Sequence, residues 1–227
     1  MSTRPGGAAI WDVDGTLVDT AEMHYAAWVD LAAEIGRPFT HADFAATFGR
    51  RNPEIIRAVF DAKASDEETA KLGERKEVKY RAAARRAGVE LLPGAETLLR
   101  GLREIGWPQA IASSAPRANL EMILDLTGTQ EFFAAVVSAE DTQRGKPDPQ
   151  VFQLAAERLG MPAERCVVFE DAVAGVEAAR AARMNCVAVR FVGHHPAEKL
   201  KVAGADRVVE SLADIAAVDV AQILVSP

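Results

Sequence analysis

Short apolar runs rich in β-branched residues alternate with longer amphipathic segments along most of the chain. The short runs occupy residues 8–13, 109–113, 134–138, 166–169, 186–191 and 207–209. Segments with helical periodicity lie between several of them, at 95–105, 120–126, 151–159 and 173–184. In the first, Leu98, Leu99, Leu102 and Ile105 recur at the spacing of one helix face. Strands that alternate with helices of this length predict an α/β fold with a parallel sheet covered on both faces.

The segment between residues 13 and 109 breaks this alternation, because most of it has helical patterns. An apolar face over 25–35 predicts one helix, and the run 54–60 after Asn52-Pro53 predicts another. Ser65-Asp66-Glu67-Glu68 has the form of a capping box before a long charged helix that runs towards Ala87. We therefore predict a helical domain inserted into the sheet domain. The predicted boundaries are 1–19 and 90–227 for the core and 20–89 for the insert.

Composition and charge narrow the class of protein. The 227 residues are 49% hydrophobic, enough for a large core, and the net charge of −7 argues against a nucleic-acid-binding surface. No apolar run approaches the roughly 18 residues of a membrane helix, and the first residues lack a secretion signal. Cys166 and Cys186 each open an apolar run and are predicted to be buried, reduced thiols. We expect a cytoplasmic monomer that contacts neither nucleic acid nor membrane.

Polar side chains follow four of the predicted strands. Since ligands of open parallel sheets bind beyond the carboxyl ends of the strands, these positions are the candidates for a site. They are Asp12 and Asp14, Ser113 and Ser114, Lys146, and Glu170 and Asp171. Asp12, Asp14 and Gly15 taken alone fit an ordinary Asp-Gly turn as well as a functional site. The residues at the other strand ends are therefore needed to distinguish the two interpretations.

The chemistry of these groups suits phosphoryl transfer. Asp12 and Asp171 offer the carboxylate oxygens that Mg²⁺ prefers, and the metal relieves their repulsion of a phosphate. Lys146 supplies positive charge that keeps Asp12 ionised, and Ser113 can donate a hydrogen bond to the transferring group. Asp14 is placed to protonate the leaving oxygen and then to activate water.

In order and spacing these segments resemble the signature motifs of the haloacid dehalogenase superfamily, among its β-phosphoglucomutase-like and phosphoglycolate phosphatase-like members. The resemblance covers essentially the whole chain. It implies a Rossmann-like core, an aspartyl-phosphate intermediate on Asp12 and a mobile four-helix cap formed by the insert. Asp14 favours a phosphate over a haloacid substrate, because halide-removing members lack this second aspartate. The implied metal site comprises Asp12, Asp14, Glu170 and Asp171. The implied phosphate-binding residues are Gly15, Thr16, Ser113, Ser114 and Lys146.

The stretch from Asp19 to His24 is similar to that of β-phosphoglucomutases. There the residues matching Thr20 and His24 lie near the hinge, and the histidine couples cap closure to the acid/base. Lys76 matches a cap lysine that faces the sugar. The alternatives are a helix-face residue without a role for His24 and a solvated charge for Lys76.

The chain departs from the mutases where those enzymes hold a second phosphate. The matching positions are Asn52 in the cap and Ala115, Pro116 and Arg117 after the second strand. Arg50, Arg51 or Arg117 could replace the missing clamp in part, since arginine binds phosphate bidentately. Arg50 and Arg51 could equally belong to a solvated loop.

Our leading hypothesis is therefore a Mg²⁺-dependent phosphatase for a small phosphomonoester such as a sugar phosphate, because water should accept the phosphoryl group if the second clamp is weak. The alternative is a β-phosphoglucomutase that transfers the group between C1 and C6 of glucose phosphate. A more remote alternative is a non-catalytic protein that binds a phosphorylated ligand.

Overall fold

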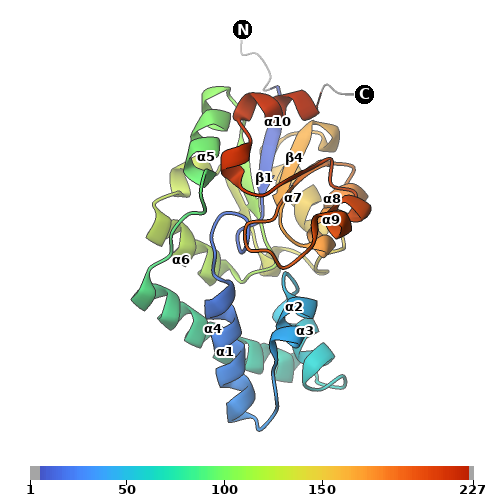
Figure 1. Cartoon of the computed structure of the whole chain (residues 1–227). Helices are drawn as coiled ribbons and strands as arrows, with labels where there is room; N and C mark the ends of the chain where they lie inside the picture. Colours follow the sequence, from blue (N-terminus) through green and yellow to red (C-terminus); the bar gives the residue numbers. More distant parts are fainter. Residues whose placement is uncertain (1–5, 225–227) are drawn as a thin grey trace.

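A six-stranded parallel sheet in the order β3-β2-β1-β4-β5-β6 forms the centre of the computed structural model, which describes residues 6–224 (Figure 1). The strands are β1 (Ala8–Trp11), β2 (Gln109–Ala112), β3 (Ala135–Val137), β4 (Cys166–Glu170), β5 (Asn185–Val189) and β6 (Arg207–Val209). All six predicted strands are present. The α/β class is confirmed, although β1 is shorter than expected and ends directly before Asp12.

The two faces of the sheet bury alternate residues of the same strands. In β1, Ala9 and Trp11 belong to one apolar cluster, and Ala8 and Ile10 belong to the other. This follows from the period of two along a strand, and the absence of polar residues in β1 reflects burial on both sides. The first face is covered by α5 (Ala95–Glu104), α6 (Arg117–Thr127) and α10 (Ala217–Ile223). The second face is covered by α7 (Gln150–Leu159), α8 (Val173–Ala181) and α9 (Ala197–Ala203).

Four helices follow β1 and lie beyond the carboxyl ends of the strands (Figure 1). They are α1 (Ala21–Glu34), α2 (His41–Thr47), α3 (Asn52–Val59) and α4 (Asp66–Ala87). Trp28, Phe39 and Phe60 are buried in an apolar cluster of their own, separate from those of the sheet. The predicted capping box is present, because the Ser65 side chain accepts from the backbone of Glu68 and the Glu68 carboxylate accepts in return. The insert is thus a helical cap over the sheet.

The chain enters and leaves the cap through two segments that lie side by side. Val18 forms an antiparallel bridge with Leu91, and the backbone N–H of Leu92 donates to the carbonyl of Leu17 at 2.8 Å. Both connections between core and cap therefore pass through one narrow place. The predicted division at residues 19/20 and 89/90 falls on these segments and stays a prediction.

Trp11, Cys166 and Cys186 lie at or near the ends of strands and are buried in the core as expected. Trp11 stacks on Phe169 with ring centroids 3.9 Å apart, and its indole N–H donates to Gln109 at 3.0 Å. Cys166 and Cys186 are both buried and free. Burial raises the pKa of the Cys166 thiol to about 12, so this thiol is neutral and unreactive.

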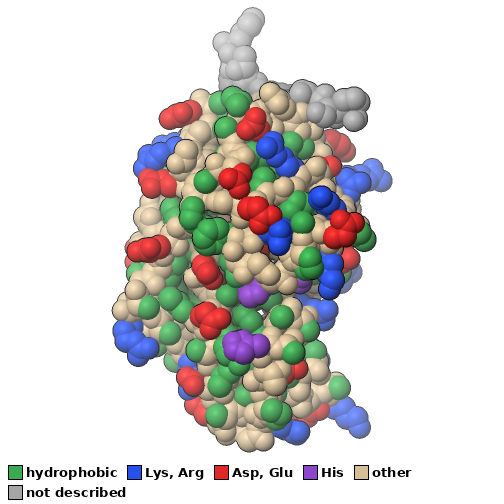
Figure 2. Space-filling model, viewed as in Figure 1, with side chains coloured by type: hydrophobic (Ala, Val, Ile, Leu, Met, Phe, Trp, Pro, Cys, Tyr) green, Lys and Arg blue, Asp and Glu red, His purple; other side chains and the backbone are tan. Residues whose placement is uncertain are grey.

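The surface carries mixed charges. On the face drawn in Figure 2, acidic and basic side chains are interspersed. Over residues 6–224, no helix has both the length and the apolar composition needed to cross a membrane.

Two apolar residues of the same helical pattern, one inside α5 and one at its end, differ in burial. Leu99 is 0% exposed, whereas Ile105, which shares its helical spacing, is the C-cap residue and 41% exposed. We expect Leu99→Ala to lower the free energy of unfolding by about 2–5 kcal/mol, because it leaves a cavity against the sheet. Ile105→Ala should change it by about 0.5 kcal/mol or less. Urea denaturation measures both, and equal effects would contradict this packing.

Candidate active site

The register of the central strands places the candidate carboxylates at one edge. Trp11 of β1 pairs with Phe169 of β4 on one side and with Ile111 of β2 on the other. Asp12, Glu170 and Ser113 therefore follow at neighbouring strand ends. The backbone N–H of Asp12 still donates to the carbonyl of Phe169 at 3.0 Å, so the end of β1 is held in place.

Lys146 connects two of these strand ends. Its Nζ donates to Asp12 Oδ1 at 2.6 Å and to Glu170 Oε1 at 2.6 Å, and it lies 4.9 Å from the ring centre of Phe152. Burial lowers the pKa of Lys146, but the charges of Asp12 and Glu170 outweigh it and hold this pKa above its ordinary value. The lysine is thus a fixed cation beside the Asp12 carboxylate.

Asp12, Glu170 and Asp171 form a buried group of carboxylates whose oxygens lie within 4.8 Å of one another. Burial raises the pKa of Asp12 to about 7 against the opposing charge of Lys146. Burial, followed by the charges of Glu170 and Asp12, also raises the pKa of Asp171. Such clustered like charges call for a cation, and hard oxygen donors fit a divalent ion of the Mg²⁺ type.

Glu170 has a structural part in this group. While its Oε1 accepts from Lys146, its Oε2 accepts from the backbone N–H groups of Asp171 and Ala172, each at 2.7 Å. A Cβ on Gly175 of α8 would overlap the Glu170 carboxylate. The small residue lets α8 approach closely enough for Glu170 to fix both Lys146 and the loop that carries Asp171.

The loop after Asp12 contains a glycine in a left-handed conformation and a hydroxyl group that is unpartnered among the described residues. Gly15 has a φ of 87°, a left-handed conformation that glycine adopts without strain, and a Cβ there would collide with the Asp171 carboxylate. The Thr16 hydroxyl is buried and has no hydrogen-bond partner in the described structure. These features fit the predicted phosphate-binding role of Gly15 and Thr16.

Asp14 points away from the three clustered carboxylates. Its Oδ1 accepts from the Thr20 hydroxyl and lies 3.2 Å from His24 Nε2. Burial raises the pKa of Asp14, but the charge of His24 and hydrogen bonds from His24 and Thr20 outweigh it, so this pKa is below its usual value. Among the described residues, Asp14 is not part of the possible metal group, which includes only three of the four predicted ligands.

His24 continues into the cap. Its Nδ1 lies 2.5 Å from the Nζ of Lys76, and its ring stacks on Tyr80 with centroids 3.7 Å apart. Lys76 is 1% exposed, which excludes a solvated helix charge. His24 thus contacts Asp14 directly, and Lys76 is connected to Asp14 through His24.

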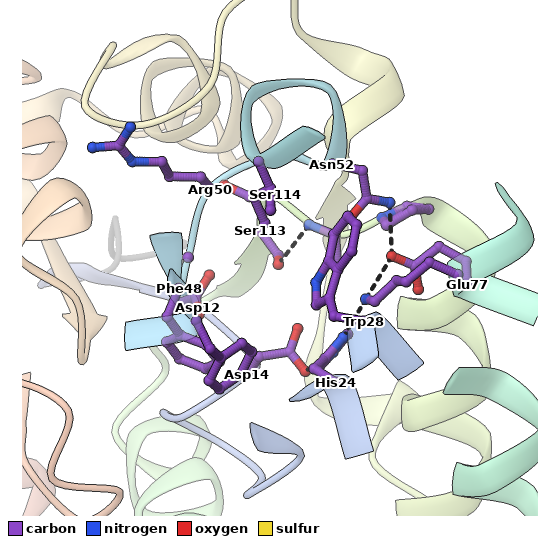
Figure 3. A pocket seen from close by; sticks show the side chains of 16 residues that line it. Asp12, Asp14, His24, Trp28, Phe48, Arg50, Asn52, Glu77, Ser113 and Ser114 are labelled. Atoms are coloured by element: carbon purple, nitrogen blue, oxygen red, sulfur yellow. Dashed lines mark hydrogen bonds and ion pairs between the residues drawn. The ribbon is translucent and has the colours of Figure 1, made fainter. Parts of the chain in front are cut away.

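Core and cap together enclose a pocket (Figure 3). Asp12, Asp14, Ser113 and Ser114 line it from the sheet side. The cap contributes the polar residues His24, Arg50, Asn52, Lys76 and Glu77 and the apolar residues Trp28, Phe44, Phe48 and Ile55. Three of the four predicted catalytic residues, Asp12, Asp14 and Ser113, thus line one cavity between core and cap, while Lys146 contacts Asp12 from outside the lining.

Two of the three candidate arginines are engaged elsewhere. Arg51 donates to the backbone carbonyls of Thr142 and Arg144, both at 2.9 Å, and Arg117 pairs with Asp141. Neither is among the residues that line the pocket, whereas Arg50 is. Arg51 instead holds the loop that leads to Lys146.

Comparison with known proteins identifies this constellation. A family model described as haloacid dehalogenase-like hydrolase matches residues 7–183. The chain belongs to the haloacid dehalogenase-like hydrolase family. It is therefore an enzyme, and the resemblance seen in the sequence motifs is confirmed.

Individual members of the family give similar matches. The chloroplastic 5-amino-6-(5-phospho-D-ribitylamino)uracil phosphatase of Arabidopsis thaliana is 32% identical over 93% of this chain, which spans 56% of that relative's length. The fructose-1-phosphate phosphatase of Escherichia coli is 33% identical over 81% of this chain and 96% of its own. The crystal structure of β-phosphoglucomutase from Clostridium difficile superposes with a TM-score of 0.85, 26% identity and 96% of both chains covered.

Glu77 and Asn119 were not among the candidates of the sequence. Glu77 accepts from Asn52 at 2.8 Å, from Lys76 at 2.9 Å and from Asn119 at 2.7 Å. Glu77 stands in a charged helix and Asn119 in a helix of the core. Only the docking of cap on core brings them together, so no local pattern could have indicated this cluster.

Gly175→Ala tests how the hydrolase positions Lys146. Because alanine favours helices, its intrinsic effect in α8 is mildly stabilising, by about 0.5–1 kcal/mol. We nevertheless expect turnover to fall roughly 10-fold or more, since the new methyl displaces Glu170 from Lys146. Gly101→Ala in α5, whose methyl would lie 3.2 Å from that of Ala217, is the control. Steady-state kinetics measures turnover, and the thermal midpoint of each variant is recorded in parallel. Equal turnover of Gly175→Ala and Gly101→Ala would contradict this role of Gly175.

Proposed function

We propose that this hydrolase is a Mg²⁺-dependent phosphatase that hydrolyses a small phosphomonoester, such as a sugar phosphate, through an aspartyl-phosphate intermediate. The observation that carries the proposal is the buried contact of Lys146 with Asp12 beside Asp171, at the floor of a pocket that also contains Asp14. The proposed nucleophile Asp12 and acid/base Asp14 thus line one cavity, and the cation Lys146 and the metal-binding carboxylate Asp171 lie directly behind Asp12.

The first half-reaction would be carried by Asp12. A carboxylate oxygen of Asp12 forms a bond to phosphorus while the bond from phosphorus to the leaving oxygen breaks. Asp14 gives that oxygen its proton. Bound at Asp12 and Asp171, Mg²⁺ supplies positive charge that lets the anionic phosphate approach the carboxylate. Lys146 keeps Asp12 ionised, and Ser113, which lines the same pocket, can donate to a phosphate oxygen.

The second half-reaction would return the enzyme to its starting state. Water attacks phosphorus, the bond to Asp12 breaks, and Asp14 takes the proton of the water. The lowered pKa of Asp14 suits this base role. A bound phosphate raises the pKa of Asp14 again through its negative charge, which suits the acid role in the first half.

Relatives support the substrate class. By their names, two relatives are phosphatases of fructose 1-phosphate and of a phosphorylated ribitylaminouracil. Both substrates are monoesters of a hydroxylated carbon chain. The pocket offers polar groups of the cap, such as Asn52, on the side away from the nucleophile, which fits hydroxyl groups.

Phosphoglucomutase activity is the second candidate, and the similarity to the C. difficile enzyme favours it. Against it stands the pocket wall where a mutase would hold its second phosphate. Ala115, Pro116 and Asn52 line this wall, while Arg51 and Arg117 bind elsewhere. Without that clamp, water rather than a sugar hydroxyl should accept the phosphoryl group.

Phosphate release from fructose 1-phosphate with Mg²⁺ tests the proposal. We expect multiple turnovers by the native protein and a loss of roughly 10³-fold or more for Asp12→Asn and Asp14→Asn, since each removes a group that forms or breaks bonds. Unchanged release by Asp12→Asn would mean another nucleophile. If none of a panel of sugar phosphates is hydrolysed, a non-catalytic ligand-binding role gains support.

The same assay with β-glucose 1-phosphate separates the two candidate reactions. In the presence of glucose 1,6-bisphosphate, a phosphatase releases inorganic phosphate faster than it forms glucose 6-phosphate. If glucose 6-phosphate forms faster than phosphate is released, the protein is a mutase and not a phosphatase.

Mg²⁺ affinity should rise with pH. The pKa of Asp12 is raised to about 7, so Asp12 is protonated below neutrality and must lose that proton before the metal binds. The raised pKa of Asp171 acts in the same direction. We expect the dissociation constant of Mg²⁺ to fall up to about 10-fold per pH unit between pH 6 and 7 and to level off above that range. Calorimetric titration in buffers of different ionisation enthalpy counts the released protons. A flat profile would contradict this arrangement.

A further inference from the structure

A buried carboxylate stands in the cap wall of the pocket. Glu77 is 2% exposed, lines the cavity and lies beside Asn52 in Figure 3. Its Oε1 accepts from Asn52 and Lys76, and its Oε2 accepts from Asn119 of α6. Three donors from three helices therefore fix one negative charge in place, where it also joins cap to core.

Glu77 neutralises the cation that this wall would otherwise present. Burial raises the pKa of Glu77, but the charge of Lys76 outweighs it, with help from His24 and the two asparagines, so the carboxylate stays ionised. Lys76 is 1% exposed and also lines the pocket. Burial lowers the pKa of Lys76, and Glu77 is the carboxylate that opposes this effect. Without Glu77, a phosphate of the substrate could take its place as the anionic partner of Lys76. Paired with Glu77, Lys76 has little attraction left for a phosphate.

We propose that Glu77 is a specificity-determining residue that restricts this enzyme to phosphomonoesters with an uncharged, hydroxylated leaving group and excludes substrates with a second phosphate. The inference rests on the proposed phosphatase function and adds to it the chemistry of the distal end of the substrate. A second phosphate at this wall would meet a fixed carboxylate and a neutralised lysine. A hydroxyl group can instead donate to a remaining lone pair of Glu77 or to the Asn52 carbonyl oxygen.

Arg50 is the other basic side chain lining the pocket, and it lies on the far side from Glu77 in Figure 3. It is exposed, whereas Lys76 is buried, so a phosphate bound by Arg50 remains in water and gains little. Binding of a second phosphate by Arg50 is nevertheless the competing explanation that an experiment has to separate.

Fructose 1-phosphate and fructose 1,6-bisphosphate form a matched pair, because they differ only in the second phosphate. We expect the native enzyme to prefer the monophosphate by roughly 100-fold in kcat/KM, since like charges meet in a partly desolvated site. Glu77→Gln should reduce this preference roughly 10-fold or more, mainly through a lower KM for the bisphosphate, because it frees the charge of Lys76. An unchanged ratio, or a native enzyme that hydrolyses both equally, overturns the proposal.

Asn119→Ala is the matched control. It removes one hydrogen bond to Glu77 and one from Arg81, yet leaves the charges of the wall intact. If Glu77 acts only by holding the cap on the core, both variants should lower turnover of the two substrates alike and keep their ratio. Our proposal requires the ratio to change in Glu77→Gln and to stay constant in Asn119→Ala.

If Glu77→Gln abolishes turnover, binding measurements can still test the proposal. In an Asp12→Asn background, calorimetry compares the affinities for the two fructose phosphates with and without Glu77→Gln. A gain in affinity for the bisphosphate alone supports the proposal, and equal changes overturn it. If Arg50→Ala abolishes affinity for the bisphosphate, whether residue 77 is glutamate or glutamine, the second phosphate is bound by Arg50 and the proposal is overturned. Failure of the native enzyme to hydrolyse any monoester refutes the phosphatase function itself, which is a different result from an unselective phosphatase.

Discussion

The contact of Lys146 with Asp12 and Glu170 is the interaction on which the rest of the site depends. Both nitrogen–oxygen distances are 2.6 Å, and all three side chains are buried. Removing one partner from such a group leaves an uncompensated buried charge, which costs several kcal/mol in proteins. The positions of Gly175 and of the β1 and β4 strand ends are therefore not independent, because each is needed to bring these groups within hydrogen-bond distance.

The cap extends this network from the floor of the pocket to its roof. Asp14 contacts His24, His24 contacts Lys76, and Lys76 contacts Glu77, which also accepts from Asn52 of the cap and from Asn119 of the core. A continuous chain of polar contacts thus runs from Asp14 of the core through α1 and α4 and back to α6. Opening the cap would separate Asp14 from His24 and Glu77 from Asn119 in the same movement.

Asp12, Ser113 and Asp171 lie together because each directly follows a short apolar strand, and a parallel sheet brings such positions to one edge whatever the helices do. The resemblance to the superfamily implied that Asp14 also belongs to the metal site. In the structure the Asp14 carboxylate is directed to Thr20 and His24. Because β1 ends at Trp11, Asp12 and Asp14 do not share a strand face, and the direction of Asp14 depends on a helix of the cap.

By itself, the sequence determined the α/β sheet and the helical insert and indicated Asp12 as the candidate nucleophile, because these follow from periodicity and from residues close together in the chain. Tertiary structure alone decided which charges of the cap are buried. Lys76 lies inside and Arg51 binds a core loop, though both stand in polar, charged stretches. Helical periodicity says which residues share a face, but not which face meets the core. The cluster of Asn52, Glu77 and Asn119 exists only where cap and core dock, since its members are distant in sequence and carry no pattern of their own.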